Sequence, residues 1–143
     1  MGEDTGDGEK RAGGVNDVES ALEKICVVDL SEGKRTDLPD GSWVCELVSK
    51  ALNGAEGTCM GFSTWKPGAS TKQMVHETEE MAYIVCGEGK LSVGEKYVSY
   101  KAGQGVLIPA GVPHGVVNDS EEDMTMVYIF SYPEYPPTKA AGE

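Results

Sequence analysis

The chain contains two histidines, and each lies in a short apolar segment that also carries glycine and proline turns. His114 follows Pro109 and Gly111 within the stretch GQGVLIPAGVPHGVVN, and His76 precedes Glu80 by four residues. Taken singly, a histidine in an apolar strand is more often a hydrogen-bonded core residue than a ligand. Two imidazoles and a carboxylate on one site could also bind a divalent metal or transfer protons. The chemistry therefore depends on whether the fold brings the two segments together.

Fixed spacings surround both histidines. The second segment has the pattern Gly-x5-Pro-x-Gly-x2-His-x3-Asn, formed by Gly103, Pro109, Gly111, His114 and Asn118. The first has the pattern Gly-x5-Met-x-His-x3-Glu-x6-Gly, formed by Gly68, Met74, His76, Glu80 and Gly87. Together they resemble the two motifs of the cupin superfamily, over about residues 58–131. The second motif matches at every position, and the first departs only at Met74, where cupins usually have the first histidine of a His-x-His pair.

The resemblance implies that His76, Glu80 and His114 are metal ligands, with Met74 at the position of a fourth. Strand geometry agrees, because side chains alternate with a period of two: Met74 and His76 share a face, and Glu80 can face them after a turn. Two imidazoles and one carboxylate form a facial triad that suits Fe(II) or a similar divalent ion and leaves positions open for substrate. We expect a divalent cofactor ion, either Fe, Mn, Ni, Cu or Zn.

Met74 leaves three interpretations open, because a thioether is a soft and weak ligand. In the interpretation that we favour, Met74 is a wall of the pocket and three protein ligands hold the metal. In the second, Met74 itself binds the metal. In the third the metal is absent, and His76, Glu80 and His114 act as general acid and base groups or as polar core residues.

Two further residues belong to the predicted site. Ala82 lies two residues after Glu80 on the same strand face, where a small side chain either leaves space for a substrate or packs in the core. Tyr128 shares a face with Met126 and Phe130, so it either packs the barrel or donates a proton in the pocket. The predicted catalytic residues are Glu80, His114 and Tyr128, and the predicted substrate pocket includes Met74 and Ala82.

Short apolar stretches punctuated by Gly and Pro predict strands about 8 to 12 residues apart, which is typical of a sandwich or barrel. They are residues 25–30, 42–50, 58–65, 72–76, 80–87, 89–93, 96–100, 105–109, 114–118 and 124–132. The capping-box spacing of Asn16 and Glu19 predicts one short helix before them. The expected fold is all-β, a double-stranded β-helix (jelly-roll, cupin) barrel with a short N-terminal helix.

Three parts follow one another along the chain. Residues 1–15 are rich in Gly, Asp and Glu, and we expect a disordered acidic tail there. Residues 16–132 are expected to form the single barrel domain. Residues 133–143 form a Pro-rich tail whose prolines remove backbone donors, so we expect it to lie across the surface or join a partner rather than extend a sheet.

Composition limits the partners and the compartment. The formal net charge of -12 argues against nucleic acid or an anionic membrane as a partner. No stretch is apolar over the roughly 20 residues of a membrane span, and the first residues do not resemble a signal peptide. We expect a cytoplasmic protein that pairs as a homodimer through its edge strands. The cysteines occur singly, so we expect small, buried, reduced side chains at Cys26, Cys45, Cys59 and Cys86.

Two classes of function fit these observations. The first is a metal-dependent enzyme that acts on a small molecule, either as a lyase, isomerase, cyclase or dehydratase or as a non-heme-iron dioxygenase. The alternative is a metal-poor or metal-free barrel that binds a small metabolite without turnover. An enzyme is favoured because no DNA-binding or second sensory domain accompanies the barrel. The only arginines are Arg11 and Arg35, which argues against a strongly anionic substrate.

Overall fold

The structure, a computed structural model, describes residues 15–143. The acidic tail expected at residues 1–15 lies outside this range except for its last residue. Within the described range the chain forms helices α1 (Val15–Glu23) and α2 (Lys50–Asn53), the 3-10 helix η1 (Leu30–Glu32) and eleven strands. None of these helices is both long enough and apolar enough to cross a membrane.

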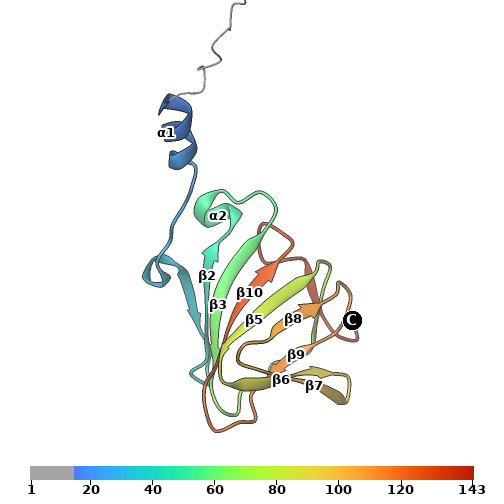
Figure 1. Ribbon diagram of the computed structural model, residues 1–143. Helices are drawn as coiled ribbons and strands as arrows, with labels where there is room; N and C mark the ends of the chain where they lie inside the picture. Colours follow the sequence, from blue (N-terminus) through green and yellow to red (C-terminus); the bar gives the residue numbers. More distant parts are fainter. Residues whose placement is uncertain (1–14) are drawn as a thin grey trace, which may run out of the picture.

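The strands form three antiparallel sheets. The largest has six strands in the order β1 (Lys34–Asp37), β2 (Trp43–Val48), β3 (Cys59–Trp65), β10 (Met124–Phe130), β5 (Glu80–Cys86) and β8 (Gly105–Ile108). The second has the order β7 (Lys96–Lys101), β6 (Glu88–Val93) and β9 (Gly115–Val117). The third pairs β11 (Thr138–Ala140) with β4 (Met74–His76). Figure 1 shows β6, β7 and β9 lying across one end of the large sheet. The predicted all-β jelly-roll barrel with a short N-terminal helix is confirmed.

The core lies between the sheets, and strand alternation decides which side chains enter it. On β5, Ile84 points inward and is fully buried, whereas its neighbour Tyr83 points outward and is 53% exposed. On β10, the inward residues Met124 and Met126 are buried, but the outward residues are only partly buried. The buried apolar cluster comprises Trp65, Ala69, Ile84, Leu91, Tyr100, Ile108, Met124 and Met126.

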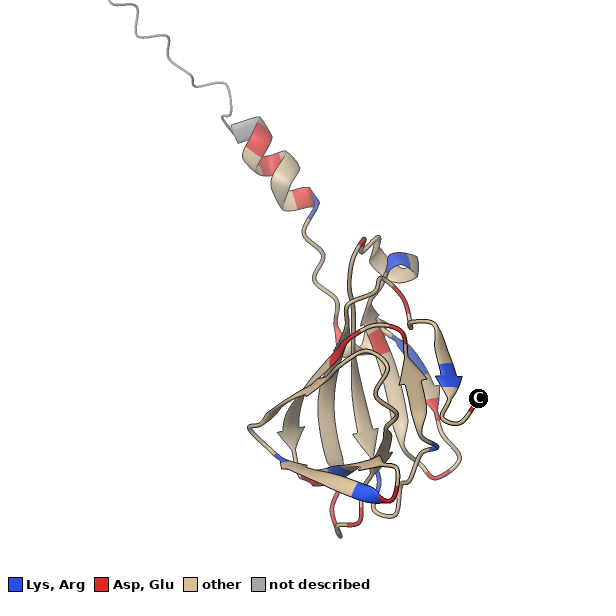
Figure 2. Ribbon diagram, turned by 90° about the vertical axis from the view of Figure 1, so that its right-hand side faces the viewer, with Lys and Arg blue, Asp and Glu red and all other residues tan. Residues whose placement is uncertain are grey.

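The N-terminal region differs from the prediction. Residues 25–30 form no strand: residues 25–29 are a link between α1 and η1, and Leu30 begins η1. Val27 on this link is 89% exposed. Figure 2 shows α1 standing away from the barrel at the end of this link. Because β-branched residues favour a strand through packing against neighbouring strands, the apolar pattern alone does not form one. The edge strand is instead β1, whose polar sequence KRTD gave no strand signal.

The cysteines are all free, but they fall into two groups. Cys45 and Cys59 are buried as expected, whereas Cys26 and Cys86 are exposed. Cys26 lies on the extended N-terminal link and Cys86 ends β5, so neither reaches the core. The prediction of burial was wrong for Cys26 because its segment joins no sheet, and for Cys86 because apolar neighbours in the sequence do not fix which face of a strand is covered.

The C-terminal segment contributes to the barrel. Its prolines end at Pro137, and Thr138–Ala140 then pair with β4 in the register Thr138 to His76 and Ala140 to Met74. Further backbone bonds join Ala141 to Gln73 and Glu77 to Pro137. The expectation that this segment could not extend a sheet was wrong, because residues beyond the last proline again have backbone donors.

Candidate metal and substrate site

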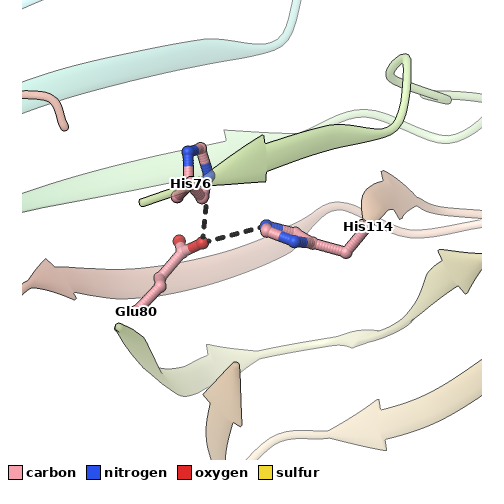
Figure 3. A group of neighbouring side chains, drawn as sticks. All are labelled: His76, Glu80 and His114. Carbon is pink, nitrogen blue, oxygen red and sulfur yellow. Dashed lines mark hydrogen bonds and ion pairs between the residues drawn. The ribbon is translucent and has the colours of Figure 1, made fainter. Parts of the chain in front are cut away.

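Three polar side chains from three separate segments converge inside the barrel (Figure 3). Glu80 Oε1 lies 3.1 Å from His114 Nε2 and 3.6 Å from His76 Nε2. The two imidazole rings meet edge to face with their centroids 4.9 Å apart. Both histidines are buried, and Glu80 is the first residue of β5. The two histidine segments therefore form one site.

Backbone pairing places the histidines on one face. Met74 and His114 are cross-strand partners, joined by N–H to O contacts of 2.8 and 3.0 Å. Side chains of cross-strand partners point to the same side of a sheet, and His76, two residues after Met74, points there as well. Met74 thus lies beside the histidines because of the sheet register.

A tight turn sets the position of His114. The Val112 N–H donates to the carbonyl of Pro109 at 3.3 Å, and Gly111 has a φ of 82°. A positive φ at the third position is typical of a type II turn and favours glycine. The Gly111 N–H also donates to the carbonyl of His76 at 2.9 Å, so the turn is bonded to the first histidine segment.

The turn also orients the His114 ring. His114 Nδ1 lies 2.9 Å from the carbonyl oxygen of Val112. A carbonyl can only accept a hydrogen bond, so Nδ1 carries a proton and donates it. Nε2 then faces Glu80 either as a protonated donor or as a lone pair that needs a cation between it and the carboxylate. The ring is set up for a proton or a metal ion.

His76 is surrounded by residues from the end of the chain. Its Nδ1 lies 2.7 Å from Thr138 Oγ1. Its ring meets Phe130 edge to face at 4.9 Å and Tyr135 at 5.6 Å, measured between centroids. Tyr135 and Thr138 belong to the segment that folds back along β4.

The pKa values of the two histidines are shifted in opposite directions. Burial lowers the pKa of His76, and the attraction of Glu80 does not compensate, so this pKa lies below its ordinary value of 6.5. Burial also lowers the pKa of His114, but the hydrogen bond to Glu80 and the contact with the Val112 carbonyl outweigh it, so the pKa of His114 lies above 6.5. In the absence of metal, His114 is therefore the first of the two to take up a proton as the pH falls.

The three side chains open into a cavity of about 430 Å³. Its walls are mostly apolar and aromatic, with Val44, Trp65, Met126 and Phe130 among them, and the exposed residue Lys72 also belongs to its lining. A second depression, of about 580 Å³, lies over Gly87, Lys101 and Glu122 and has no histidine. We take the first as the functional cavity because the convergent polar groups lie in it.

The other predicted site residues lie in different places. Met74 and Tyr128 line the cavity. The ring of Tyr128 passes over Gly61, where a Cβ would overlap it. Burial, followed by the charge of Glu46, raises the pKa of Tyr128 above its ordinary value of 10.0. Ala82 does not line this cavity but a void of about 20 Å³, which Glu80 and His114 also border and whose other walls are apolar or aromatic.

Sequence reasoning missed the residues that the C-terminal segment adds. Tyr135 lines the cavity, and Thr138 contacts His76. Neither belongs to a recognisable motif, and Thr138 is 62 residues from His76. The only signal was the end of the proline run at Pro137, after which a short strand becomes possible.

The donor set fits a divalent metal ion. One donor atom from each of His76, Glu80 and His114 lies within 4.8 Å of the others. Neighbouring ligands of an ion with bonds of about 2.1 Å are separated by roughly 3.0 to 3.5 Å; the 3.1 Å between Glu80 and His114 lies within this range, and the 3.6 Å between Glu80 and His76 lies just above it. Two imidazoles and a carboxylate suit Mn, Fe, Ni, Cu or Zn. Within residues 15–143, His76, Glu80 and His114 thus form a possible metal site.

Known proteins share both the motif region and the fold. A family model described as "Cupin domain" matches residues 61–130, which contain both histidine segments. The chain is a cupin. An uncharacterized protein of Streptomyces coelicolor is 31% identical over 75 residues, which make up 52% of this cupin and 70% of that protein.

Solved cupin structures superpose on most of the chain. The polyketide cyclase RemF from Streptomyces resistomycificus has a TM-score of 0.71 at 20% identity, with 83% of this chain and 87% of RemF covered. A Bacillus subtilis oxalate decarboxylase described with Mn(II) centers has a TM-score of 0.68 at 21% identity, with 78% of this chain covered. This cupin spans only 31% of the decarboxylase chain. At these identities the likeness establishes the fold.

Proposed function

We propose that this cupin is a metal-dependent enzyme that acts on a small, largely apolar carbonyl compound by non-oxidative chemistry, as a cyclase, isomerase, dehydratase or lyase. The observation that carries this proposal is the position of the His76, Glu80 and His114 donors at the wall of an apolar, aromatic cavity of about 430 Å³. A cavity of this size accommodates a molecule of several fused or linked rings.

Metal binding and substrate orientation are assigned to different side chains. His76, Glu80 and His114 would hold the ion, which when bound supplies Lewis-acid polarisation of a carbonyl oxygen. Trp65 and Phe130 offer flat apolar surfaces against which a ring system can be oriented. These walls also keep water away from the reacting carbonyl, which strengthens the electrostatic interactions within the site.

Tyr128 is the proposed proton donor. Its raised pKa keeps the hydroxyl protonated near neutral pH, so it can donate a proton but is poorly suited to act as a base. Glu80, at the cavity wall, can accept the α-proton of the carbonyl compound, and Lys72 can counter the negative charge of the resulting enolate. When the enolate carbon attacks a second carbonyl, Tyr128 can give its proton to the alkoxide oxygen and recover one from Glu80, so a carbon–carbon bond forms without an oxidant.

The likeness to RemF supports the cyclase among these chemistries. RemF is described as a polyketide cyclase, and the superposition covers 83% of this chain and 87% of RemF. Polyketides carry several carbonyl groups on an apolar framework, which matches a cavity with apolar walls and one polar cluster. Aromatic and multi-ketone compounds are therefore the substrates to test first.

Tryptophan fluorescence can test ligand binding directly. Of the two tryptophans, Trp65 lines the cavity. Trp43 lies on the face of β2 that points away from the cavity, where it packs against Phe62 and Arg35. In the Trp43→Phe protein, aromatic ketones and added Mn²⁺ should both quench the remaining emission. Unchanged emission with every compound and every metal would contradict the proposal.

Turnover provides the second test. Tyr128→Phe should lower kcat by about 100-fold, within the range for loss of a general acid, while KM stays within about threefold. Tyr83→Phe is the matched control, because Tyr83 is an exposed tyrosine on the outer face of β5. Equal activity of the Tyr128→Phe and wild-type proteins would remove Tyr128 from the mechanism. Oxygen consumption during turnover would replace the non-oxidative chemistry with a dioxygenase.

A second candidate function is a barrel that binds a metabolite without metal or turnover. It is favoured by the direct contact of 3.1 Å between Glu80 and His114, which forms a satisfied ion pair when His114 is protonated. Elemental analysis of protein purified without chelator separates the two functions. About one Fe, Mn, Ni, Cu or Zn per chain supports the enzyme, and a metal-free protein that still binds ligands in the fluorescence test supports the binder.

The expected homodimer stays a prediction. The outer faces of the neighbouring strands β5 and β8 expose Met81, Tyr83, Val85 and Leu107, which the same face of a second copy would cover. Light scattering should give twice the chain mass of 15.2 kDa, and Leu107→Asp should shift it toward the monomer. A monomeric wild-type protein at micromolar concentration would contradict the dimer.

A further inference from the structure

We propose that Thr138, on the C-terminal strand β11, is a positioning residue that selects the tautomer of His76 and so presents His76 Nε2 to the metal. The proposal deepens the proposed metal site and rests on it for the role of Nε2. The choice of tautomer itself is a property of the metal-free protein and can be tested without any metal.

The hydrogen bonds of Thr138 determine this choice. Its hydroxyl has a single proton, which it donates to the carbonyl of Pro136 at 2.7 Å. The same oxygen lies 2.7 Å from His76 Nδ1. With its proton already used, Thr138 Oγ1 can only accept in the second contact, so Nδ1 of His76 carries the proton and donates it. The other ring nitrogen, Nε2, is then left with its lone pair.

That lone pair points at the remaining donors of the site. His76 Nε2 faces Glu80 Oε1 at 3.6 Å, and His114 Nε2 faces the same oxygen at 3.1 Å. If His76 had the opposite tautomer, Nε2 would carry a hydrogen and could not bind an ion. An outer-shell partner that fixes the tautomer of a ligating histidine typically changes metal affinity by 10- to 100-fold when it is removed.

The backbone holds Thr138 firmly enough for this role. Thr138 is the cross-strand partner of His76 in the β11–β4 ladder. Bonds from the Glu77 N–H to the Pro137 carbonyl and from the Ala141 N–H to the Gln73 carbonyl secure the segment on both sides of Thr138. His114 needs no such help, because Val112, two residues away, fixes its ring. The C-terminal segment is thus part of the site through Thr138.

The decisive experiment compares Thr138→Val with Thr138→Ser in the full-length, untagged, metal-free protein. Long-range ¹H–¹⁵N spectra resolve the ring nitrogens, and the chain has only two histidines, so each signal can be assigned. In the wild type, at a pH above the titration of both rings, His76 should be in the Nδ1–H form. Thr138→Val should change His76 to a mixture or to the Nε2–H form, and Thr138→Ser should retain the wild-type spectrum.

His114 serves as the internal control for folding. Its signals should stay unchanged in both variants, since its Nδ1–H donates to the Val112 carbonyl and makes no contact with Thr138. If Thr138→Val leaves His76 in the Nδ1–H form with His114 unaffected, the proposal is overturned. It is also overturned if Thr138→Ser changes the tautomer as much as Thr138→Val does, because the contribution would then come from packing of the methyl group.

Metal titration separates this proposal from the proposed function. Binding of Mn²⁺ or Zn²⁺ to Thr138→Val should be 10- to 100-fold weaker than to the wild type, and Thr138→Ser should restore it. If the wild type binds neither ion but the tautomer still follows the hydroxyl, the metal site fails while Thr138 retains its role on His76. If the ions bind equally to all three proteins, the role of Thr138 toward the metal is contradicted.

Discussion

The two histidine segments reach the same site by different means. Residues 103–118 themselves contain the groups that orient His114: the turn at Gly111 sets the chain direction, and the Val112 carbonyl accepts a hydrogen bond from the His114 ring. Residues 68–87 do not, because His76 depends on Thr138 from the far end of the chain. When the residues that orient a site histidine are its sequence neighbours, the sequence shows both the histidine and those residues. When the orienting residue is far away in the sequence, the sequence shows the histidine alone.

Replacement of Glu80 should have the largest effect, because Glu80 joins the two segments. Glu80→Gln removes the negative charge that both Nε2 atoms face. The loss of metal affinity should exceed the 10- to 100-fold typical of an outer-shell partner. Elemental analysis measures it, with Glu79→Gln as the control at an exposed neighbouring position. Full metal content in Glu80→Gln would show that the segments do not share an ion.

Met74→His should strengthen metal binding by the first histidine segment, residues 68–87. Met74 is the cross-strand partner of His114 and lines the cavity beside His76. An imidazole in this position adds a fourth ligand that suits Mn or Zn better than a thioether, so affinity should rise by about tenfold or more. Titration calorimetry measures the change, and Met81→His on the outer face of β5 is the control. No gain would mean that Met74 lies too far from the ion.

The pH dependence of the metal-free protein should separate the two histidines. In an NMR titration, His114 should take up its proton above pH 6.5 and His76 below it. The raised pKa of His114 contributes stability that is complete below the unfolded value of about 6.5 and is lost as the pH rises through the folded value. The lowered pKa of His76 acts oppositely, with stability lost as the pH falls from about 6.5 toward its folded value.

Glu80→Gln should reverse the direction of the pKa shift of His114 but not that of His76. Without the carboxylate, burial is the largest remaining influence on His114, so its pKa should fall below 6.5. The pKa of His76, already lowered by burial, should fall further. If His114 in Glu80→Gln still titrated above pH 6.5, its support would come from the turn alone rather than from Glu80.

The smallest effect is expected from the turn glycines. Gly111 and Gly68 both have positive φ and open space around an added Cβ, so alanine at either position should cost about 1 to 2 kcal/mol through backbone strain alone. Chemical denaturation measures this cost. Only Gly111→Ala should also weaken metal binding, by a few-fold, because the Gly111 turn directly precedes His114. Equal metal affinity in both variants would mean that the ring is held by Val112 irrespective of the turn.

The sequence predicted the barrel because alternating apolar strands and glycine turns are local features with a direct structural meaning. It failed for residues 25–30, where the apolar pattern lacks a sheet to pack against, and for β1, whose residues are polar. For Ala82, the spacing gave the strand face correctly but could not show that Ala82 borders a separate small void instead of the main cavity.

By itself, the sequence determined the residue types of the site, their spacing and the strand faces on which they lie, because motif and alternation act over a few residues. Only the tertiary structure decided that Met74 pairs with His114, that Tyr128 crosses Gly61 and that Thr138 bonds His76. These contacts depend on sheet register and on the return of the C-terminal strand. Such long-range pairings arise from the packing of the whole chain and leave no local pattern.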